Sequence, residues 1–279
     1  MTNAGPDIIK TSGEKVKFSF TKLRRSLKKS GASDAIVSAI INEIKDELYQ
    51  GISTKELYNR AYAMLKDYRG AYASRYSLKK AIYELGPSGF AFEKYVAEIL
   101  RINGYKITLN PILQGKCVTH EIDIIATRDS GRHLIECKFH SEEGRKCDVK
   151  IPLYIKSRFD DIYAFEKSHE HDKGWLVTNT QFTQDALSYG KCAGLKLLSW
   201  NYPEEGSLKE LIDKSMIYPV TSSTILSSSE KQFLLDRGII LGSQLLNKDF
   251  LLDHSGISEE RKKRIISEFR NLCNKELNA

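Results

Sequence analysis

HEIDIIA (residues 120–126) and HLIECKF (residues 133–139) are the two stretches of sequence that decide the fold. Each interleaves charged side chains with strong strand formers such as Ile and Phe, so both are predicted to form β-strands. Buried strands are usually apolar, and a strand that carries carboxylates and a lysine breaks that rule. Because such exceptions tend to mark functional sites, we expect the chemistry of this protein to lie here.

The charged side chains of these two strands are predicted to meet on one face of a sheet. Glu136 and Lys138 are separated by one residue, so both point to the same side of their strand. A two-residue loop at 130–131 places Asp123 opposite Lys138, and a four-residue loop at 128–131 places it opposite Glu136. Either register brings the three side chains to within about 5–8 Å of one another. The expected site therefore requires an even number of loop residues.

Two carboxylates and a lysine in this arrangement suit metal-assisted hydrolysis. Together with a backbone carbonyl, Asp123 and Glu136 offer the oxygen ligands that a hard cation such as Mg²⁺ prefers. A lysine beside the cation can orient or deprotonate an attacking water, whose pKa the metal lowers. A bare E-x-K pattern is also found as a salt bridge between Glu136 and Lys138, so the wider sequence has to decide between the two.

The residues around these strands predict a mixed α/β domain with one central sheet. Helical patterns at residues 88–103, 150–167 and 183–192 alternate with strand patterns at 105–113, 174–179 and 195–200. Gly86-Pro87-Ser88-Gly89 breaks the chain before this region, and the hydroxyl-rich residues 221–229 are typical of a linker after it. We therefore expect three domains, at residues 1–87, 88–218 and 219–279.

The segment from Gly89 to Trp200 resembles the PD-(D/E)xK nucleases, specifically the Mrr-like restriction endonucleases. Four stretches match in the right order: FAFEKYVAEILRINGY (90–105), EIDIIA (121–126), LIECKF (134–139) and WLVTNTQFTQDA (175–186). The resemblance implies a restriction-endonuclease-like α+β fold, with a mixed central sheet flanked by helices. It also implies a DNA endonuclease that uses Mg²⁺ or Mn²⁺, with Asp123 and Glu136 as metal ligands and Lys138 as the catalytic lysine.

Other charged residues of this segment have two interpretations each. Glu93 occupies a position where such nucleases often carry an additional acidic residue, which makes it a candidate catalytic residue. A glutamate in the first turn of a helix is also favoured by the helix dipole. Glu121 either joins the metal ligands or faces solvent. Lys156 and Arg158 either contact DNA phosphates or belong to a solvated helix face.

The net charge of +7 is concentrated in the first third of the chain. Residues 1–89 hold 16 Lys and Arg against 9 Asp and Glu, whereas residues 90–218 and 219–279 have net charges of −1 and +1. This concentration favours a local site for a polyphosphate or for DNA over a uniform coat. Residues 8–20 predict a β-hairpin that turns at Ser12-Gly13, and helical patterns follow at 34–48, 53–68 and 71–85.

These elements resemble an ATP-cone, the regulatory nucleotide-binding module of ribonucleotide reductases and their repressor. IIKTSGEKVKF (8–18), GIST (51–54) and ASRYSLKKA (73–81) match in order. The resemblance implies ATP or dATP as a regulatory ligand. It implies contacts from Lys10 and Lys22 to the phosphates, from Leu23 and Thr54 to the base, and from Lys79 or Lys80 to close the site. Thr11, a further candidate, stands where the family usually has arginine.

Residues 219–279 predict short helices, with Ser229 and Ser258 as their first polar caps. Leu-Leu-x-x-Gly-Ile with a later Gly-Ile-Ser resembles a degenerate helix-hairpin-helix. That resemblance implies sequence-independent contact with DNA phosphates, assisted by the basic run at residues 261–264. A small helical packing or dimerisation module is the other interpretation.

The composition excludes several classes of protein. With 41% hydrophobic and 28% charged residues the chain is globular, and none of its apolar runs approaches a membrane span. Five scattered cysteines and the absence of a secretory leader favour the cytoplasm. We expect a homo-oligomeric, cytoplasmic DNA endonuclease gated by a nucleotide, without a membrane partner. The alternatives are a nucleotide-sensing DNA-binding regulator that does not cleave, and an RNA nuclease or junction resolvase with the same chemistry.

Overall fold

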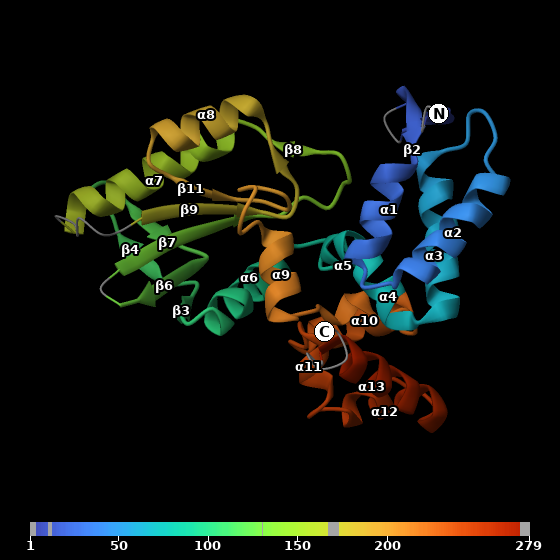
Figure 1. Ribbon diagram of the computed structural model, residues 1–279. Coiled ribbons are helices and arrows are strands. Elements are labelled where there is room, and N and C mark those ends of the chain that lie inside the picture. Colours follow the sequence, from blue (N-terminus) through green and yellow to red (C-terminus); the bar gives the residue numbers. More distant parts are fainter. Residues whose placement is uncertain (1–3, 11–12, 130, 167–172, 274–279) are drawn as a thin grey trace. The chain divides into compact units, whose positions relative to one another are not determined.

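The computed structural model describes residues 4–10, 13–129, 131–166 and 173–273 (Figure 1). The chain divides into two compact units. Unit 1 comprises residues 1–81, 222–233 and 242–279, and unit 2 comprises residues 82–221 and 234–241. Unit 1 therefore combines the N-terminal region with most of the C-terminal region, which lie far apart in the sequence.

A five-stranded mixed sheet forms the centre of unit 2, in the order β11-β9-β7-β6-β3. The strands β3 (Lys106–Leu109), β6 (Ile124–Arg128) and β7 (Gly131–Lys138) are antiparallel, whereas β9 (Lys173–Thr178) and β11 (Lys196–Leu198) run parallel to β7. Helix α6 (Phe90–Ile102) packs on one face, and α7 (Lys150–Glu166) and α8 (Gln184–Cys192) pack on the other (Figure 1). The predicted fold class, a mixed central sheet flanked by helices, is confirmed.

Two of the predicted strands are interrupted, and the interruptions shape the site. The pattern at 105–113 divides into β3 and β4 (Ile112–Gln114) at Asn110, whose φ of 50° is left-handed, and at Pro111, which cannot donate to a ladder. The strand predicted over HEIDIIA (120–126) divides into β5 (Thr119–Glu121), which pairs with β4, and β6. Asp123 therefore lies just before β6 begins. The remaining elements of unit 2 are the parallel pair β8 (Lys146–Cys147) and β10 (Gln181–Phe182), and α9 (Leu208–Ser215).

The apolar core under α7 and α8 ends where the charged residues begin. Leu134 of β7, Leu176 of β9 and Phe159 of α7 belong to this core and are fully buried. Because side chains alternate along a strand, Glu136 and Lys138 follow Leu134 on the same face of β7. The apolar residues thus hold the middle of β7 in the core, and the charged residues Glu136 and Lys138 lie at its carboxyl end.

Unit 1 begins with the predicted hairpin, formed by β1 (Ala4–Ile9) and β2 (Lys15–Ser19). The helices α1 (Phe20–Lys29), α2 (Asp34–Asp46), α3 (Thr54–Tyr68) and α4 (Gly70–Tyr76) follow and enclose an apolar core, and α5 (Leu78–Tyr83) comes next along the chain. Ser33 and Ser53 cap α2 and α3 through their hydroxyl oxygens. The single helix predicted at 71–85 is broken at Ser77, whose hydroxyl donates to the Ser74 carbonyl.

Of the hydroxyl-rich residues 221–229, predicted to be a linker, residues 221–226 are instead buried or half-buried, with a 3₁₀ turn at Val220–Ser222, and residues 227–229 are exposed. Ser223 is only 4% exposed, and its hydroxyl donates to Glu268 Oε2 at 2.5 Å. The backbone N–H and the hydroxyl of Thr224 donate to Glu268 Oε1 at 2.9 and 2.7 Å. The prediction was wrong because hydroxyl groups, which are common in linkers, here serve as donors to a buried carboxylate.

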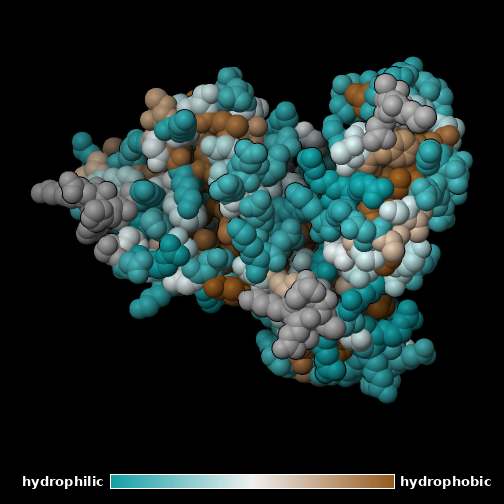
Figure 2. All heavy atoms as spheres, in the orientation of Figure 1, coloured by the Kyte–Doolittle hydropathy of each residue, from teal (hydrophilic) through white to brown (hydrophobic). Residues whose placement is uncertain are grey.

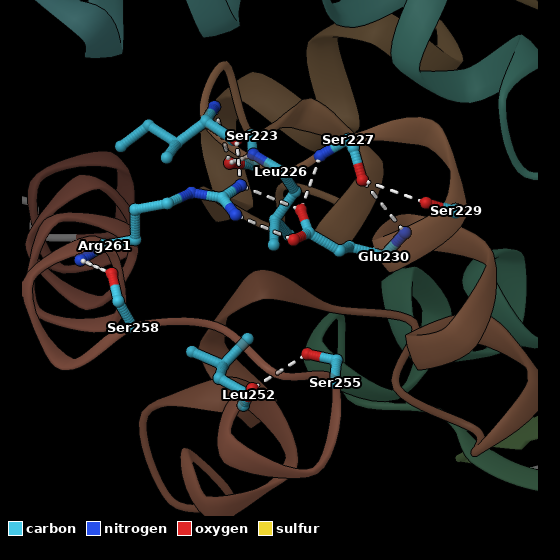
Figure 3. A network of polar contacts seen from close by, with 10 residues as sticks. Ser223, Leu226, Ser227, Ser229, Glu230, Leu252, Ser255, Ser258 and Arg261 are labelled. Carbon is cyan, nitrogen blue, oxygen red and sulfur yellow. Dashed lines mark hydrogen bonds and ion pairs between the residues drawn. The ribbon is translucent and has the colours of Figure 1, made fainter.

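The described part of the C-terminal region, up to residue 273, contains the helices α10 (Ser228–Asp236), α11 (Gly242–Leu245), α12 (Phe250–His254) and α13 (Glu259–Cys273). The cap of α10 is Ser227 rather than Ser229, because Ser227 and Glu230 exchange hydrogen bonds of 3.3 and 2.8 Å in a capping box (Figure 3). Ser258 caps α13 as predicted. None of the described helices is both long and apolar enough to cross a membrane.

Candidate active site

Asp123 and Glu136 are brought together by the register of β6 and β7. Ile124 pairs with Ile135 and Arg128 with Gly131, so one residue further along Asp123 comes opposite Glu136. The turn then consists of residues 129–130, of which residue 130 lies outside the described residues. The loop is even, and the register is the one predicted for the longer loop. A hydrogen bond joins the two carboxyl groups, and Asp123 Oδ2 also accepts from Cys137 N at 2.7 Å.

Burial and mutual repulsion control the protonation of these carboxyl groups. Desolvation, and then the charge of Asp123, raise the pKa of Glu136 to about 8. Desolvation likewise raises the pKa of Asp123. Glu93, from the first turn of α6, lies near enough that desolvation and the Asp123 charge raise its pKa to about 7. The structure thus brings the three predicted carboxyl groups into one region of negative charge.

Arg158 of α7 supplies a positive charge to this region. Its Nη1 donates to Glu136 Oε1 at 2.6 Å, and its Nη2 donates to the carbonyl oxygen of Glu121. The Arg158 side chain is 16% exposed and that of Glu136 is 9% exposed, so the pair is largely shielded from water. A solvated helix face does not describe Arg158, although Lys156 does pair along the helix surface with Asp160.

A signal in the sequence could have placed Arg158 in the site. The buried residues of α7 include Ile155, Phe159 and Ile162, which face the sheet. Arg158 lies three residues after the first of these and four before the last, a spacing that puts it on the same helix face. A charged residue within an apolar stripe requires a buried partner, and Glu136 is that partner.

Lys138 is the last residue of β7, and its side chain is exposed. Within the described part of the chain, its ammonium group has no hydrogen-bond or ion-pair partner. The backbone just beyond it is fixed by the buried Asn179, which accepts from His140 N at 2.9 Å and donates to His140 O at 2.8 Å. Lys138 therefore presents an exposed ammonium group at the end of β7, next to a backbone segment that Asn179 holds in place.

Glu121 ends β5 with its side chain exposed, which favours its solvent-facing interpretation. Among the described residues there is no cluster of three or more Asp, Glu, His or Cys side chains arranged to hold a metal ion. Two carboxylates still fit a divalent cation that keeps several waters, as Mg²⁺ does. The crowding of Glu93, Asp123 and Glu136 points the same way, since a cation relieves the repulsion that raises their pKa values.

In unit 1, residues predicted to bind a nucleotide surround a cavity of about 300 Å³. Of the predicted residues, Lys10, Lys22, Leu23 and Thr54 line it. The other lining residues come from the hairpin, α1, α3 and α4: Ile8, Val16, Lys17, Phe18, Ser19, Ser26, Leu57, Tyr58 and Tyr76. Lys79 is exposed and is absent from this lining, and Thr11 lies outside the described residues.

Two tyrosines give this cavity an aromatic wall. The rings of Tyr58 and Tyr76 are stacked, with centroids 5.1 Å apart. Burial raises the pKa of Tyr76 to about 12, so its phenol stays neutral. Lys10 and Lys22 are exposed, which leaves the charged groups of the cavity in contact with solvent. The cavity therefore combines an apolar, aromatic interior with a cationic rim.

Three domain families match the chain in succession. They are the ATP cone domain at residues 6–84, the restriction endonuclease domain at 86–201 and the domain described as AF1548-like, C-terminal at 218–273. An uncharacterised protein of Archaeoglobus fulgidus is 31% identical over 178 residues, which are 63% of this chain and 99% of the relative.

Solved structures resemble the chain as well. The crystal structure of AF1548, a protein of unknown function, superposes with a TM-score of 0.55 at 29% identity and covers 67% of this chain and 98% of that one. MspJI restriction endonuclease, solved with a 27-mer oligonucleotide, gives a TM-score of 0.29 at 12% identity, over 83% of this chain and 47% of its own.

The domain matches confirm the predicted order, in which an ATP cone precedes an Mrr-like restriction endonuclease domain. The identity to the Archaeoglobus fulgidus protein extends over nearly the whole of that relative. This chain therefore belongs to the family of that uncharacterised protein and carries an ATP cone domain together with a restriction endonuclease domain.

Proposed function

We propose that this protein is a DNA endonuclease that depends on a divalent metal and is regulated by ATP or dATP. The observation that carries the proposal is the pairing of Asp123 with Glu136, two residues before Lys138 at the end of β7, in a domain that matches restriction endonucleases. Burying two neighbouring carboxyl groups raises the free energy of the folded state. A role in binding the metal ion for phosphodiester hydrolysis accounts for this cost.

Each residue of the site has a role in this proposal. Asp123 and Glu136 hold Mg²⁺ or Mn²⁺, which when bound activates a water and stabilises negative charge on the phosphodiester. The Cys137 N–H orients Asp123, and the Arg158 guanidinium orients Glu136. Lys138 directs its ammonium group to the attacking water or to the phosphate. Glu93, whose pKa of about 7 lies near neutral pH, can hold or release a proton at the edge of the site.

The cone supplies the regulation in this proposal. Lys10 and Lys22 contact the triphosphate, and Leu23, Thr54 and the ring of Tyr76 contact the base and sugar. Lys79 closes over the ligand, as in the family that the cone resembles. A nucleotide alters the nuclease only to the extent that it binds two states of the protein with different affinity. Because cutting both strands of a duplex requires two sites, we also propose a homo-oligomer.

One observation favours a second candidate, a nucleotide-sensing DNA-binding regulator that does not cleave. Arg158 Nη1 already lies 2.6 Å from Glu136 Oε1, so a positive charge of the protein itself faces this carboxyl group. If this guanidinium permanently occupies the place of a cation, the carboxylates serve stability rather than catalysis. The two candidates differ in whether the protein binds a divalent metal and cuts.

The experiment is a cleavage assay with the full-length protein on supercoiled plasmid. Mg²⁺, Mn²⁺ or EDTA is present, with and without ATP or dATP, and the variants Lys138→Met and Glu121→Gln are run in parallel. We expect metal-dependent nicking that Lys138→Met abolishes and that Glu121→Gln leaves within about threefold, because Glu121 is exposed. Single-stranded RNA and a four-way DNA junction are included as other substrates. Nucleotide-dependent DNA binding without cleavage in any metal contradicts the proposal and supports the regulator.

A further inference from the structure

We propose that helix α1 carries a binding surface for the phosphate backbone of duplex DNA. The surface consists of Arg24, Arg25, Lys28 and Lys29, and we call it the α1 basic stripe. The inference rests on the proposed function, because it identifies how the nuclease would hold its substrate. The C-terminal helices and α1 are both rich in basic residues. The contacts that these residues already make within the protein show which of the two surfaces is available to DNA.

The stripe lies on a different face of α1 from the nucleotide cavity. Lys22, Leu23 and Ser26 line the cavity, and none of the four stripe residues does. At 100° per residue the centres of the two groups lie about 135° apart around the helix. The stripe residues, together with Thr21, border an open surface hollow of about 440 Å³. One helix thus presents a nucleotide-facing side and a basic outer side.

The composition of α1 is unlike that of an ordinary solvated helix face. Its ten residues, FTKLRRSLKK, include five Lys or Arg and no Asp or Glu. Arg24 and Lys28, like Arg25 and Lys29, are four residues apart, a spacing at which like charges repel. On the face shown in Figure 2, the surface over α1 is hydrophilic. Such a concentration of one charge is explained by a partner of the opposite charge.

The stripe residues are available to a partner. Within the described residues, Arg25 and Lys29 form no hydrogen bond or ion pair. Among the residues that the structure describes, Arg24 donates only to the hydroxyl of Ser38, at 3.4 Å. Lys28 pairs with Asp34 at 2.7 Å, with 51% and 74% of the two side chains exposed. Exposed pairs of this kind are weak and exchange readily.

Two residues of the basic run of α13 already form ion pairs within the protein. Arg261 forms two bonds of 2.9 Å with Glu230, and Figure 3 shows its guanidinium directed at that carboxylate. Lys262 pairs with Asp253 at 2.7 Å. Half of the predicted phosphate contacts at 261–264 are therefore used inside unit 1. The α1 basic stripe is the more available of the two surfaces.

The geometry of the stripe favours duplex backbone over single strands. Residues 24–29 span about 8 Å of helix, which matches two or three phosphates spaced about 3.4 Å apart along the axis of one strand. Proteins that hold single strands stack the bases on aromatic side chains. Of the described residues, Thr21 and the four basic residues line the hollow beside the stripe, and none of these five is aromatic. A contact built this way positions DNA without reading its sequence.

The test is a binding titration with the full-length protein in a Lys138→Met background, so that the DNA stays intact. Fluorescence anisotropy of a labelled duplex is recorded over a series of NaCl concentrations for two charge-reversal variants. One is Arg25→Glu with Lys29→Glu. The matched control is Lys45→Glu with Lys55→Glu, which changes the same charge at exposed positions on α2 and α3. Circular dichroism melting and ATP titration establish that both variants fold.

We expect the stripe variant to bind at least about tenfold more weakly and its plot of log K against log salt to be less steep by about 2. The control should stay within about threefold. Equal losses in the two variants would overturn the proposal and leave a solvated helix face. A larger loss for single-stranded RNA than for duplex would show that the partner is of another class. If the stripe variant loses DNA binding but the wild-type protein does not cleave DNA, the proposed endonuclease function is rejected and the binding surface stands. If the wild-type protein cleaves DNA but the stripe variant binds it as well as before, the binding surface is rejected and the endonuclease function stands.

Discussion

Unit 2 buries or half-buries the carboxyl groups of its candidate site together with Arg158, whereas unit 1 displays most of its charges on the surface. Glu136 and Arg158 are at most 16% exposed on their side chains, but the four residues of the α1 basic stripe are all exposed. Buried charges are costly, so they are few, paired and held in one geometry, which is what bond chemistry requires. Exposed charges cost little and act together, which suits the binding of a polyanion. Substitutions in the candidate site of unit 2 should therefore change cleavage and metal binding, whereas substitutions in the α1 basic stripe of unit 1 should change the affinity for DNA.

The largest effect is expected at Asp123. Replacing Asp123 with Asn removes a candidate metal ligand but keeps a side chain of the same size, so the hydrogen bond from Cys137 N can survive. We expect cleavage of plasmid to fall by about 10³-fold or more, as for the loss of a principal catalytic group. Binding of Mn²⁺, measured by calorimetry, should be lost in parallel. Wild-type cleavage in Asp123→Asn would contradict the assignment.

The second effect concerns pH and metal. The pKa of Glu136 is about 8 in the folded protein against an ordinary value of 4.5, because of burial and the neighbouring Asp123. Between these pH values the folded state binds a proton that the unfolded state has released. The free energy of unfolding should then decrease as pH rises, by about 1.4 kcal/mol per pH unit at most.

Urea unfolding at pH 5, 6, 7 and 8 in EDTA measures this slope. Mg²⁺ binds the ionised carboxylates, so its addition should stabilise the protein most at pH 8 and flatten the dependence. Glu136→Gln should flatten it without metal. A slope that is the same in wild type and variant would place the responsible groups elsewhere.

The parts of the fold that depend on local pattern were predictable. Ser33 and Ser53 cap helices whose apolar residues recur at helical spacing, and alternating residues marked β6 and β7. An even loop was required for Asp123 and Glu136 to meet, and the observed register has one. These features follow from neighbours in the sequence, which a single chain contains in full.

The parts that depend on distant partners were not predictable in the same way. Arg158 entered the site because its partner lies 22 residues earlier, on another element. The hydroxyls of Ser223 and Thr224 are buried because a carboxylate 44–45 residues later accepts from them. No local pattern distinguishes such a hydroxyl from one in a linker. The spacing along α7 was a usable signal for Arg158, since it falls on the apolar stripe.

Glu268 provides a test of the comparison between the two units, because it is a buried charged residue in unit 1. It is 7% exposed and accepts from Ser223, Thr224 and, at 3.4 Å, the Ser74 hydroxyl of α4. Glu268→Ala leaves these donors unpaired, so we expect a loss of about 2 kcal/mol in the free energy of unfolding. Glu43→Ala, at an exposed position on α2, should change it by less than about 0.5 kcal/mol.

Urea unfolding of the two variants measures the difference. If buried charge in unit 1 serves structure alone, Glu268→Ala at a temperature well below its unfolding should still cleave at a rate near that of the wild type. A loss of cleavage greater than the loss of folded protein would show instead that this carboxylate takes part in function.

The smallest effect should separate the two faces of α1. Lys22 lines the cavity of the cone, whereas Lys28, six residues later on the same helix, borders the outer hollow. Lys22→Met removes one charged contact with a triphosphate, so we expect calorimetry with the full-length protein to give an ATP affinity about tenfold lower. Lys28→Met removes the same charge from α1 but no contact in the cavity, and its affinity should stay within about twofold of wild type. Equal losses would mean that α1 attracts the nucleotide through its overall charge, and the division of the helix into a nucleotide face and a DNA face would then have no basis.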